Sequence, residues 1–270
     1  TITNAVGGTS TGRDGGDGIY CGDTLTIEGG EIKQTTGGEA TGDGGYGIRS
    51  DGDLKIEGGT IGSLTTDDNG KQIPAPTTGA LGGNAATGEQ GGHGIYSKGQ
   101  LFISDGANII NAKGGDATGE DSTGEDSTGG SGIRSGSVVK ISGDTITKAT
   151  GGNATGENST GGSGIGGSFV NVEGGTINTT GGSGKSGGAG IDGDIVSISN
   201  TNTPLDITAT SPDADKAIQS RDGKTPDKII HLEENGKLGL VKLIENGENV
   251  KTLHFHPLPL RCCSPRCGRY

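Results

Sequence analysis

Apolar residues recur along this chain in short groups at regular spacing. An isoleucine follows a Gly-x-Gly step six times, at Ile19, Ile48, Ile95, Ile133, Ile165 and Ile191. In the first four copies, two more apolar residues stand six and eight positions after this isoleucine, as Leu25 and Ile27 do, and another follows near the position of Ile32. Apolar residues separated by one polar residue are typical of a strand with one buried face. Each unit therefore predicts three short strands.

The units align although the distance between them varies. One begins GGDGIYCGDTLTIEGGEI at Gly15 and the next GGYGIRSDGDLKIEGGTI at Gly44, and consecutive isoleucines of the set are 26 to 47 residues apart. Three short strands repeated about six times predict an all-β fold, namely a parallel β-helix (β-solenoid) of about six to seven coils. The general preference of parallel crossovers predicts a right-handed coil. A β-propeller is the alternative, but its blades usually hold four longer strands.

The chain divides into three predicted parts. Residues 1–216 carry the glycine-rich solenoid. Residues 217–256 hold more lysine and two Asn-Gly steps, which predict a β-hairpin-like cap or the start of a further module. Residues 257–270 form a tail with Cys262, Cys263 and Cys267, whose spacing matches no zinc site. Cys21 stands alone in the body, so we do not expect disulfides to hold the fold together.

Composition narrows the fold further. Glycine accounts for 60 of 270 residues and apolar residues for only 27%. Such a chain is either disordered or a repetitive solenoid, and the periodicity favours the solenoid. We expect the glycines at tight corners. The inserts between units share a GGxATG or GGxAATG pattern and should align as loops along one edge. That edge would carry Glu39, Glu89, Glu120, Asp121, Glu125, Asp126 and Glu157.

Charge and length exclude some partners. The net charge is −12, and residues 1–128 carry all of it, with 7 basic and 19 acidic side chains. This part would repel nucleic acid and anionic membrane surfaces. No apolar run is long enough to span a membrane. The chain begins at Thr1 without a signal-peptide pattern, so we expect a segment of a longer protein.

The position directly after the repeated isoleucine carries the candidate binding residues. It is occupied by Tyr20, Arg49, Tyr96 and Arg134 in successive copies. Equivalent positions stack in a solenoid, so these side chains should form one row on an outward face. Aromatic rings beside arginines suit contact with a sugar or with another chain, and a solvated surface is the alternative. No His/Asp/Ser constellation stands out, so we do not expect an enzyme.

The unit GGxGIxSxGxLxIxGGxI resembles glycine-rich repetitive β-helix domains of bacterial cell-surface and secreted proteins. These include pectate-lyase-like β-solenoids described as carbohydrate-binding domain-containing. The resemblance covers roughly residues 15–200. It implies an extracellular or cell-surface location. Some such domains bind calcium through acidic residues after the Gly-Ile strand, and the matching positions here are Asp51, Asp53, Asp192 and Asp194. We therefore expect no cofactor other than calcium.

These observations lead to one preferred function and two alternatives. The preferred one is a non-enzymatic extracellular β-solenoid with a structural or adhesive role, which binds polysaccharide or a cell surface. The first alternative is a subunit that self-associates into a homo-oligomer, fibre or appendage. The second is a polysaccharide lyase or hydrolase. We expect no nucleic-acid partner.

Overall fold

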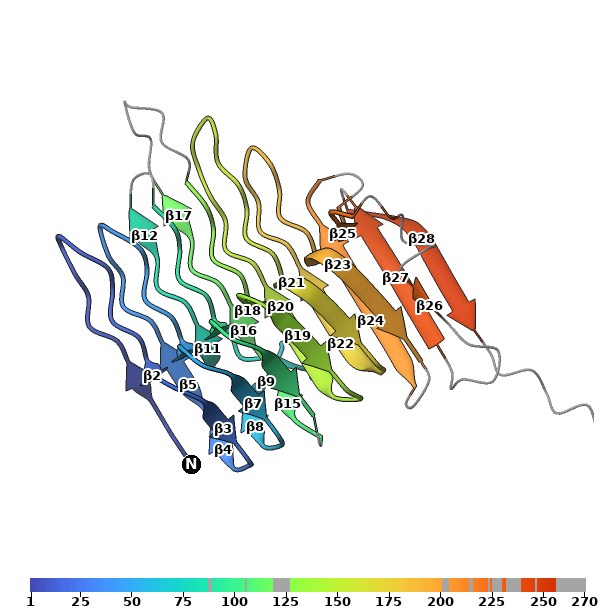
Figure 1. Ribbon diagram of the computed structural model, residues 1–270, viewed down its shortest axis with the longest axis horizontal. Coiled ribbons are helices and arrows are strands. Elements are labelled where there is room, and N and C mark those ends of the chain that lie inside the picture. The colour runs from blue at the N-terminus through green and yellow to red at the C-terminus, as the bar shows by residue number, and fades with distance from the viewer. Residues whose placement is uncertain are drawn as a thin grey trace, which may run out of the picture.

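The chain folds into two facing β-sheets, each built mainly from parallel strands (Figure 1). The computed structural model describes residues 1–86, 89–104, 106–118, 127–200, 204–213, 216–222, 224, 230–231, 239–245 and 247–255. Among these residues there are strands and turns and no helix. The predicted all-β parallel β-helix is therefore confirmed. Cys262, Cys263 and Cys267 lie outside the described residues.

The first sheet contains two of the strands predicted in each coil. The six repeated isoleucines and Ile218 pair in register from coil to coil, which gives seven stacked coils. The sheet consists of β2 (Ile19–Cys21), β3 (Leu25–Ile27), β6 (Ile48–Ser50), β7 (Leu54–Ile56), β13 (Ile95–Ser97), β14 (Leu101–Ile103), β18 (Ile133–Ser135), β19 (Val138–Ile141), β21 (Ile165–Val172), β23 (Ile191–Ser199), β25 (Ile218–Ser220) and β26 (Ile230–His231).

The second sheet contains the third predicted strand and a fourth segment that the apolar pattern did not reveal. The fourth segment turns alanine or threonine inward, as at Ala80 and Thr35, and such small residues do not mark a strand in the sequence. The sheet consists of β1 (Ala5–Val6), β4 (Glu31–Ile32), β5 (Gln34–Thr36), β8 (Thr60–Ile61), β11 (Gly79–Leu81), β15 (Asn108–Ile109), β16 (Ala112–Lys113), β20 (Thr145–Thr150), β22 (Gly175–Thr180), β24 (Leu205–Ser211), β27 (Gly239–Glu245) and β28 (Glu248–Phe255).

The core lies between the two sheets and consists of stacked aliphatic residues. Ile48, Leu54, Ile56 and Ile61 represent one coil, and each is at most 1% exposed. Burying one such side chain stabilises the fold by about 1.5–3 kcal/mol. Each strand turns alternate residues outward, so each coil presents a fixed set of positions to solvent on both sheets.

Most glycine pairs do not lie at tight corners, contrary to our expectation. They lie in two arms, where the chain leaves the second sheet and where it returns to the first. The N–H of Gly45 donates to the carbonyl of Gly38 at 2.9 Å, and the N–H of Gly83 donates to that of Gly45 at 2.8 Å. A Cβ at Gly37 would lie 1.8 Å from the Gly45 oxygen. Backbone therefore packs directly on backbone, and only glycine leaves room for this approach.

A different set of glycines does lie at tight corners, as the sequence predicted. The turns that lead from the first sheet to the second contain residues with positive φ, at Gly30, Gly59, Gly106 and Gly143. This left-handed backbone favours glycine because it has no Cβ. Glycine thus has two physical roles in each coil.

Inserts extend from the tips of the glycine arms (Figure 1). Among the described residues these tips align along one edge, as the sequence predicted. Ser10, Ala40, Ala85, Ala117 and Ala154 are paired from coil to coil there, and β12 (Ala85–Ala86) pairs with β17 (Ala117–Thr118). Among the acidic residues predicted for this edge, Glu120, Asp121, Glu125 and Asp126 lie outside the described residues. The hairpin of β9 (Leu64–Thr66) and β10 (Gln72–Pro74) is an exception, because this antiparallel insert lies between β8 and β11 of the second sheet and not at the tip of a glycine arm.

The two ends of the stack differ. At the C-terminal end, β27 pairs in parallel with β24, so parallel stacking continues beyond residue 216. The predicted hairpin then ends it, because β28 pairs antiparallel with β27. At the N-terminal end, β2 and β3 pair on one side only, and Ile19, Leu25 and Ile27 are only partly buried.

Candidate functional site

The four residues predicted to form an outward row do so. Tyr20 pairs with Arg49, Arg49 with Tyr96, and Tyr96 with Arg134 on β2, β6, β13 and β18. We call these four residues the tyrosine–arginine row. The same row continues with Gly166 and Asp192. The stacking follows from the in-register isoleucines, because each row residue comes directly after one of them.

Hydrogen bonds and an ion pair tie together the first two members of the row. The Arg49 guanidinium contacts Asp51 Oδ1 at 2.9 Å and lies 3.7 Å from Asp17 Oδ2. The Tyr20 hydroxyl donates to Asp51 Oδ2 at 2.9 Å, and the guanidinium carbon is 5.5 Å from the Tyr20 ring centroid. The bonds from Arg49 and Tyr20 lower the pKa of Asp51, while the bond to Asp51 raises the pKa of Tyr20. This group is fully paired within the protein.

A second outward column, missed in the sequence, packs against the row. It occupies the variable position of GGxGI and contains Tyr46 and His93. The ring centroids of Tyr46 and Tyr96 are 4.9 Å apart and nearly parallel, and the His93 ring lies 5.3 Å from both. His93 is 3% exposed, and its Nδ1 accepts the N–H of Ser131 at 2.8 Å. Burial, aided by the charge of Arg134, lowers the pKa of His93 to about 3.

The residues implied for calcium do not fit a calcium site. Both carboxylate oxygens of Asp51 are already bonded, and Asp53 Oδ1 accepts the N–H of Gln100 at 2.8 Å. Asp192 and Asp194 both bind the guanidinium of Arg221, at 2.8 and 3.1 Å. Within the described part of the chain, no three His, Cys, Asp or Glu side chains gather as metal ligands. Calcium prefers six to eight oxygen ligands, which these pairs do not supply.

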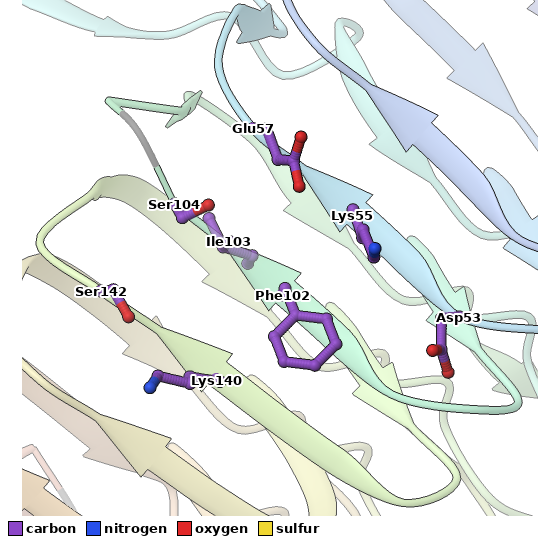
Figure 2. A pocket seen from close by; sticks show the side chains of 8 residues that line it. All are labelled: Asp53, Lys55, Glu57, Phe102, Ile103, Ser104, Lys140 and Ser142. Atoms are coloured by element: carbon purple, nitrogen blue, oxygen red, sulfur yellow. The ribbon is translucent and has the colours of Figure 1, made fainter.

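A shallow groove of about 470 Å³ lies on the outer face of the first sheet (Figure 2). Lys55, Phe102 and Lys140 pair in register across its floor, on β7, β14 and β19. Figure 2 shows the Phe102 ring between the strands that carry the two lysines. We call this surface the Phe102 groove, and its lining residues are Asp53, Lys55, Glu57, Phe102, Ile103, Ser104, Lys140 and Ser142.

The Phe102 groove joins an apolar ring to groups that can form hydrogen bonds. Lys140 Nζ lies 3.2 Å from Glu173 Oε1, whereas Lys55 forms no ion pair with the described residues. Phe102 is half-buried, so part of its side chain is available for contact. Ligand sites commonly combine an apolar surface with a few polar groups at its rim. The sequence offered little signal here, because the column reads Thr26, Lys55, Phe102 and Lys140 in successive coils and its one aromatic residue occurs once.

Three of the seven acidic residues predicted for the edge formed by the inserts belong to the described part of the chain. Glu39, Glu89 and Glu157 lie there, and Glu39 Oε1 accepts a bond from the Asn84 amide at 3.2 Å. No helix in the described chain is long and apolar enough to cross a membrane. Comparisons with protein-family models, with curated proteins and with solved structures each found no match for this chain.

Proposed function

We propose that this protein is a non-enzymatic β-solenoid of the extracellular space or cell surface that binds polysaccharide. The observation that carries the proposal is the Phe102 groove, where an aromatic ring lies between two in-register lysines on an open, shallow surface. A sugar ring can pack its C–H face against Phe102 while the amines and carboxylates at the rim bond its hydroxyls. An open groove on a regular sheet suits a chain molecule better than an enclosed cavity would.

The sequence supports the same role. The repeat resembles glycine-rich β-helix domains of bacterial surface and secreted proteins, which implies an adhesive or polysaccharide-binding function outside the cell. The acidic first half disfavours nucleic acid as a partner. The charges that line the Phe102 groove are mixed, with Lys55 and Lys140 opposed by Asp53 and Glu57. This balance does not exclude a neutral polymer.

Affinity electrophoresis in gels containing a panel of neutral and acidic polysaccharides tests the proposal. We expect at least one polymer to retard the protein, and Phe102→Ala to weaken that binding about tenfold through the lost ring contact. Lys55→Ala should weaken it less. Leu64→Ala on β9 and Lys148→Ala on the second sheet are controls, because both lie outside the groove. The proposal fails if no polymer retards the protein or if Phe102→Ala binds as the wild type does.

The tyrosine–arginine row is a second surface that the same gels can test. Tyr96→Ala and Arg134→Ala should reduce retardation if the polymer extends from the Phe102 groove onto the row. Unchanged retardation in both variants would remove the row from the binding surface and leave the groove alone.

The non-enzymatic part of the proposal needs its own measurement. Incubation of the protein with pectin-like and other polysaccharides should release no new reducing ends and no unsaturated products. Release of either, at a rate proportional to protein concentration, would replace the proposal with a polysaccharide hydrolase or lyase.

One observation favours self-association as a second candidate function. Val6 is 62% and Ile2 41% exposed at the N-terminal coil, where β2 and β3 pair on one side only, and Leu25 and Ile27 are partly buried there. Exposed strand edges next to apolar side chains are sites where chains associate. Sedimentation velocity over a range of protein concentrations tests this. Concentration-dependent growth supports a homo-oligomer or fibre, and a constant monomer contradicts it.

A further inference from the structure

The outward row that holds the tyrosines and arginines is interrupted in the fifth coil. Gly166 stands where the preceding coils have Arg134 and Tyr96, and Gly167 follows it. On the far side of this gap the row resumes with Asp192. Beside this gap lies a recess of about 50 Å³, which we call the notch. Its lining residues are Arg134, Ser135, Gly136, Gly167, Ser168, Asp192, Asp194 and Arg221.

One wall of the notch is a buried carboxylate with a spare oxygen. Asp192 is 7% exposed, and its Oδ2 is 2.8 Å from Arg221 Nη2. Its Oδ1 is buried and has no hydrogen-bond partner. Burial raises the pKa of Asp192 overall, and the charges of Arg221 and Arg134, together with the Ser163 hydroxyl, lower it only in part. A buried acceptor without a partner is costly, so a donor group from a ligand would be bound favourably.

The opposite wall is an arginine with spare donors. Arg134 donates no hydrogen bond and forms no ion pair among the described residues. A Cβ placed on Gly166 would lie 3.5 Å from Arg134 Nη1, so the guanidinium lies over Gly166. Arg134 and Asp192 both line the notch, and the charge of Arg134 lowers the pKa of Asp192. A guanidinium always carries its proton and can only donate.

The charges around the notch balance. Two arginines, Arg134 and Arg221, face two aspartates, Asp192 and Asp194. The arginines would attract an anion while the aspartates repel it, and a cation would be attracted by the aspartates and repelled by the arginines. A hydroxyl group suits both walls, because its oxygen accepts from a guanidinium while its hydrogen is donated to a carboxylate. The volume is sufficient for a group of that size and too small for a whole sugar ring.

We infer that the notch is a subsite that binds a hydroxyl group of a neutral sugar, with Arg134 as donor and Asp192 Oδ1 as acceptor. The inference rests on the proposed function in taking a glycan as the ligand. It adds a second point of contact on the outer face of the first sheet, separate from the Phe102 groove. The pair of Arg134 and Asp192 would recognise a hydroxyl group, which the ring of Phe102 cannot do.

Titration of the full-length protein with methyl glycosides of glucose, galactose and mannose, followed by ¹H–¹⁵N NMR, tests the inference. We expect saturable shifts at the amides of Gly166, Gly167 and Ser168 for at least one glycoside, with an affinity weaker than about 1 mM for so few contacts. Sodium acetate and tetramethylammonium chloride serve as charged probes and should not produce them.

Two variants and a matched control make the test specific. Gly166→Ala places a methyl group against the donor, 3.5 Å from Arg134 Nη1. Asp192→Asn replaces the acceptor with a group of the same shape that can donate. Each should weaken the glycoside response at least tenfold. Gly22→Ala is the control, because its Cβ would also meet its nearest atom at 3.5 Å, far from the notch. Far-UV circular dichroism should show all three variants folded.

The outcomes separate the two proposals. Shifts absent for every glycoside, or equal in Gly166→Ala and wild type, overturn the notch as a sugar subsite and leave an ordered water as its occupant. This result does not touch polysaccharide binding that depends on Phe102. Conversely, the proposed function is overturned if no polymer retards the protein. The NMR titration with glycosides still tests the notch in that case, because it does not depend on polymer binding.

Discussion

At the residue scale, the outward face of the first sheet shows how identical positions acquire different tasks. Arg49 is held by Asp51 and Asp17, whereas Arg134, two coils further on, donates no hydrogen bond to any residue that the structure describes. The backbone positions of these two arginines are equivalent. The difference arises from their neighbours, because Asp51 and Asp17 pair with Arg49, while Asp192 and Asp194, which line the notch with Arg134, pair with Arg221. A residue's row could be predicted from the sequence, but its partners could not.

His93 makes the stability of the protein depend on pH. In the folded state its pKa is about 3, against an ordinary value near 6.5, because it is buried without a compensating charge. Below pH 6.5 the unfolded chain therefore binds a proton that the folded protein does not, and stability falls as pH falls. Between pH 7 and pH 5 we expect this residue to cost about 2 kcal/mol.

His93→Asn tests this dependence. Its side-chain oxygen can accept the N–H of Ser131, as Asp17 Oδ1 accepts that of Tyr46 at the equivalent position. The free energy of unfolding, measured by denaturant titration at pH 7 and pH 5, should fall more steeply for the wild type than for the variant. Equal pH dependence in the two proteins would show that His93 is already protonated in the folded state.

At the element scale, each coil is a pair of strands on each sheet followed by two glycine arms. The strands with isoleucine were predictable, because alternation of apolar and polar residues has a clear period. The glycine arms were not, because a Gly-Gly pair has the same appearance in a turn and in a closely packed backbone layer. The distinction depends on what the opposite arm contains, and the two arms are separated by an insert of variable length.

The glycine arms should tolerate no side chain. A Cβ at Gly114 would lie 1.9 Å from the backbone oxygen of Gly130, and neither backbone segment can move without breaking the layer. We expect Gly114→Ala to destabilise the protein by about 3 kcal/mol or more, at or above the upper end of overpacking costs. Thermal unfolding followed by circular dichroism would measure the effect.

Gly22→Ala is the matched control for the glycine arms. Its Cβ would meet only the Tyr20 hydroxyl at 3.5 Å, an ordinary contact. The substitution should be neutral or slightly stabilising, since alanine restricts the unfolded chain more than glycine does. If both variants melt together, the close approach of the arms does not determine stability.

At the scale of the whole molecule, the stack is one-dimensional. The strands of each coil pair with the coils immediately before and after it, so stability is approximately a sum over neighbouring pairs. The C-terminal end is closed by the β27–β28 hairpin, while the N-terminal coil has a neighbour on one side only. The repeat predicted this architecture. The difference between the two ends depends on β28, which pairs antiparallel with β27.

This inequality predicts a gradient of local opening, which amide hydrogen exchange can measure. Leu101 and Ile103 of the third coil are 0% exposed, whereas Leu25 and Ile27 at the same positions of the first coil are only partly buried. Opening the first coil breaks one interface with little apolar surface, and opening the third breaks two. We expect amides of β2 and β3 to exchange faster than those of β13 and β14. Uniform exchange across these strands would instead require that the whole stack opens as a single cooperative unit.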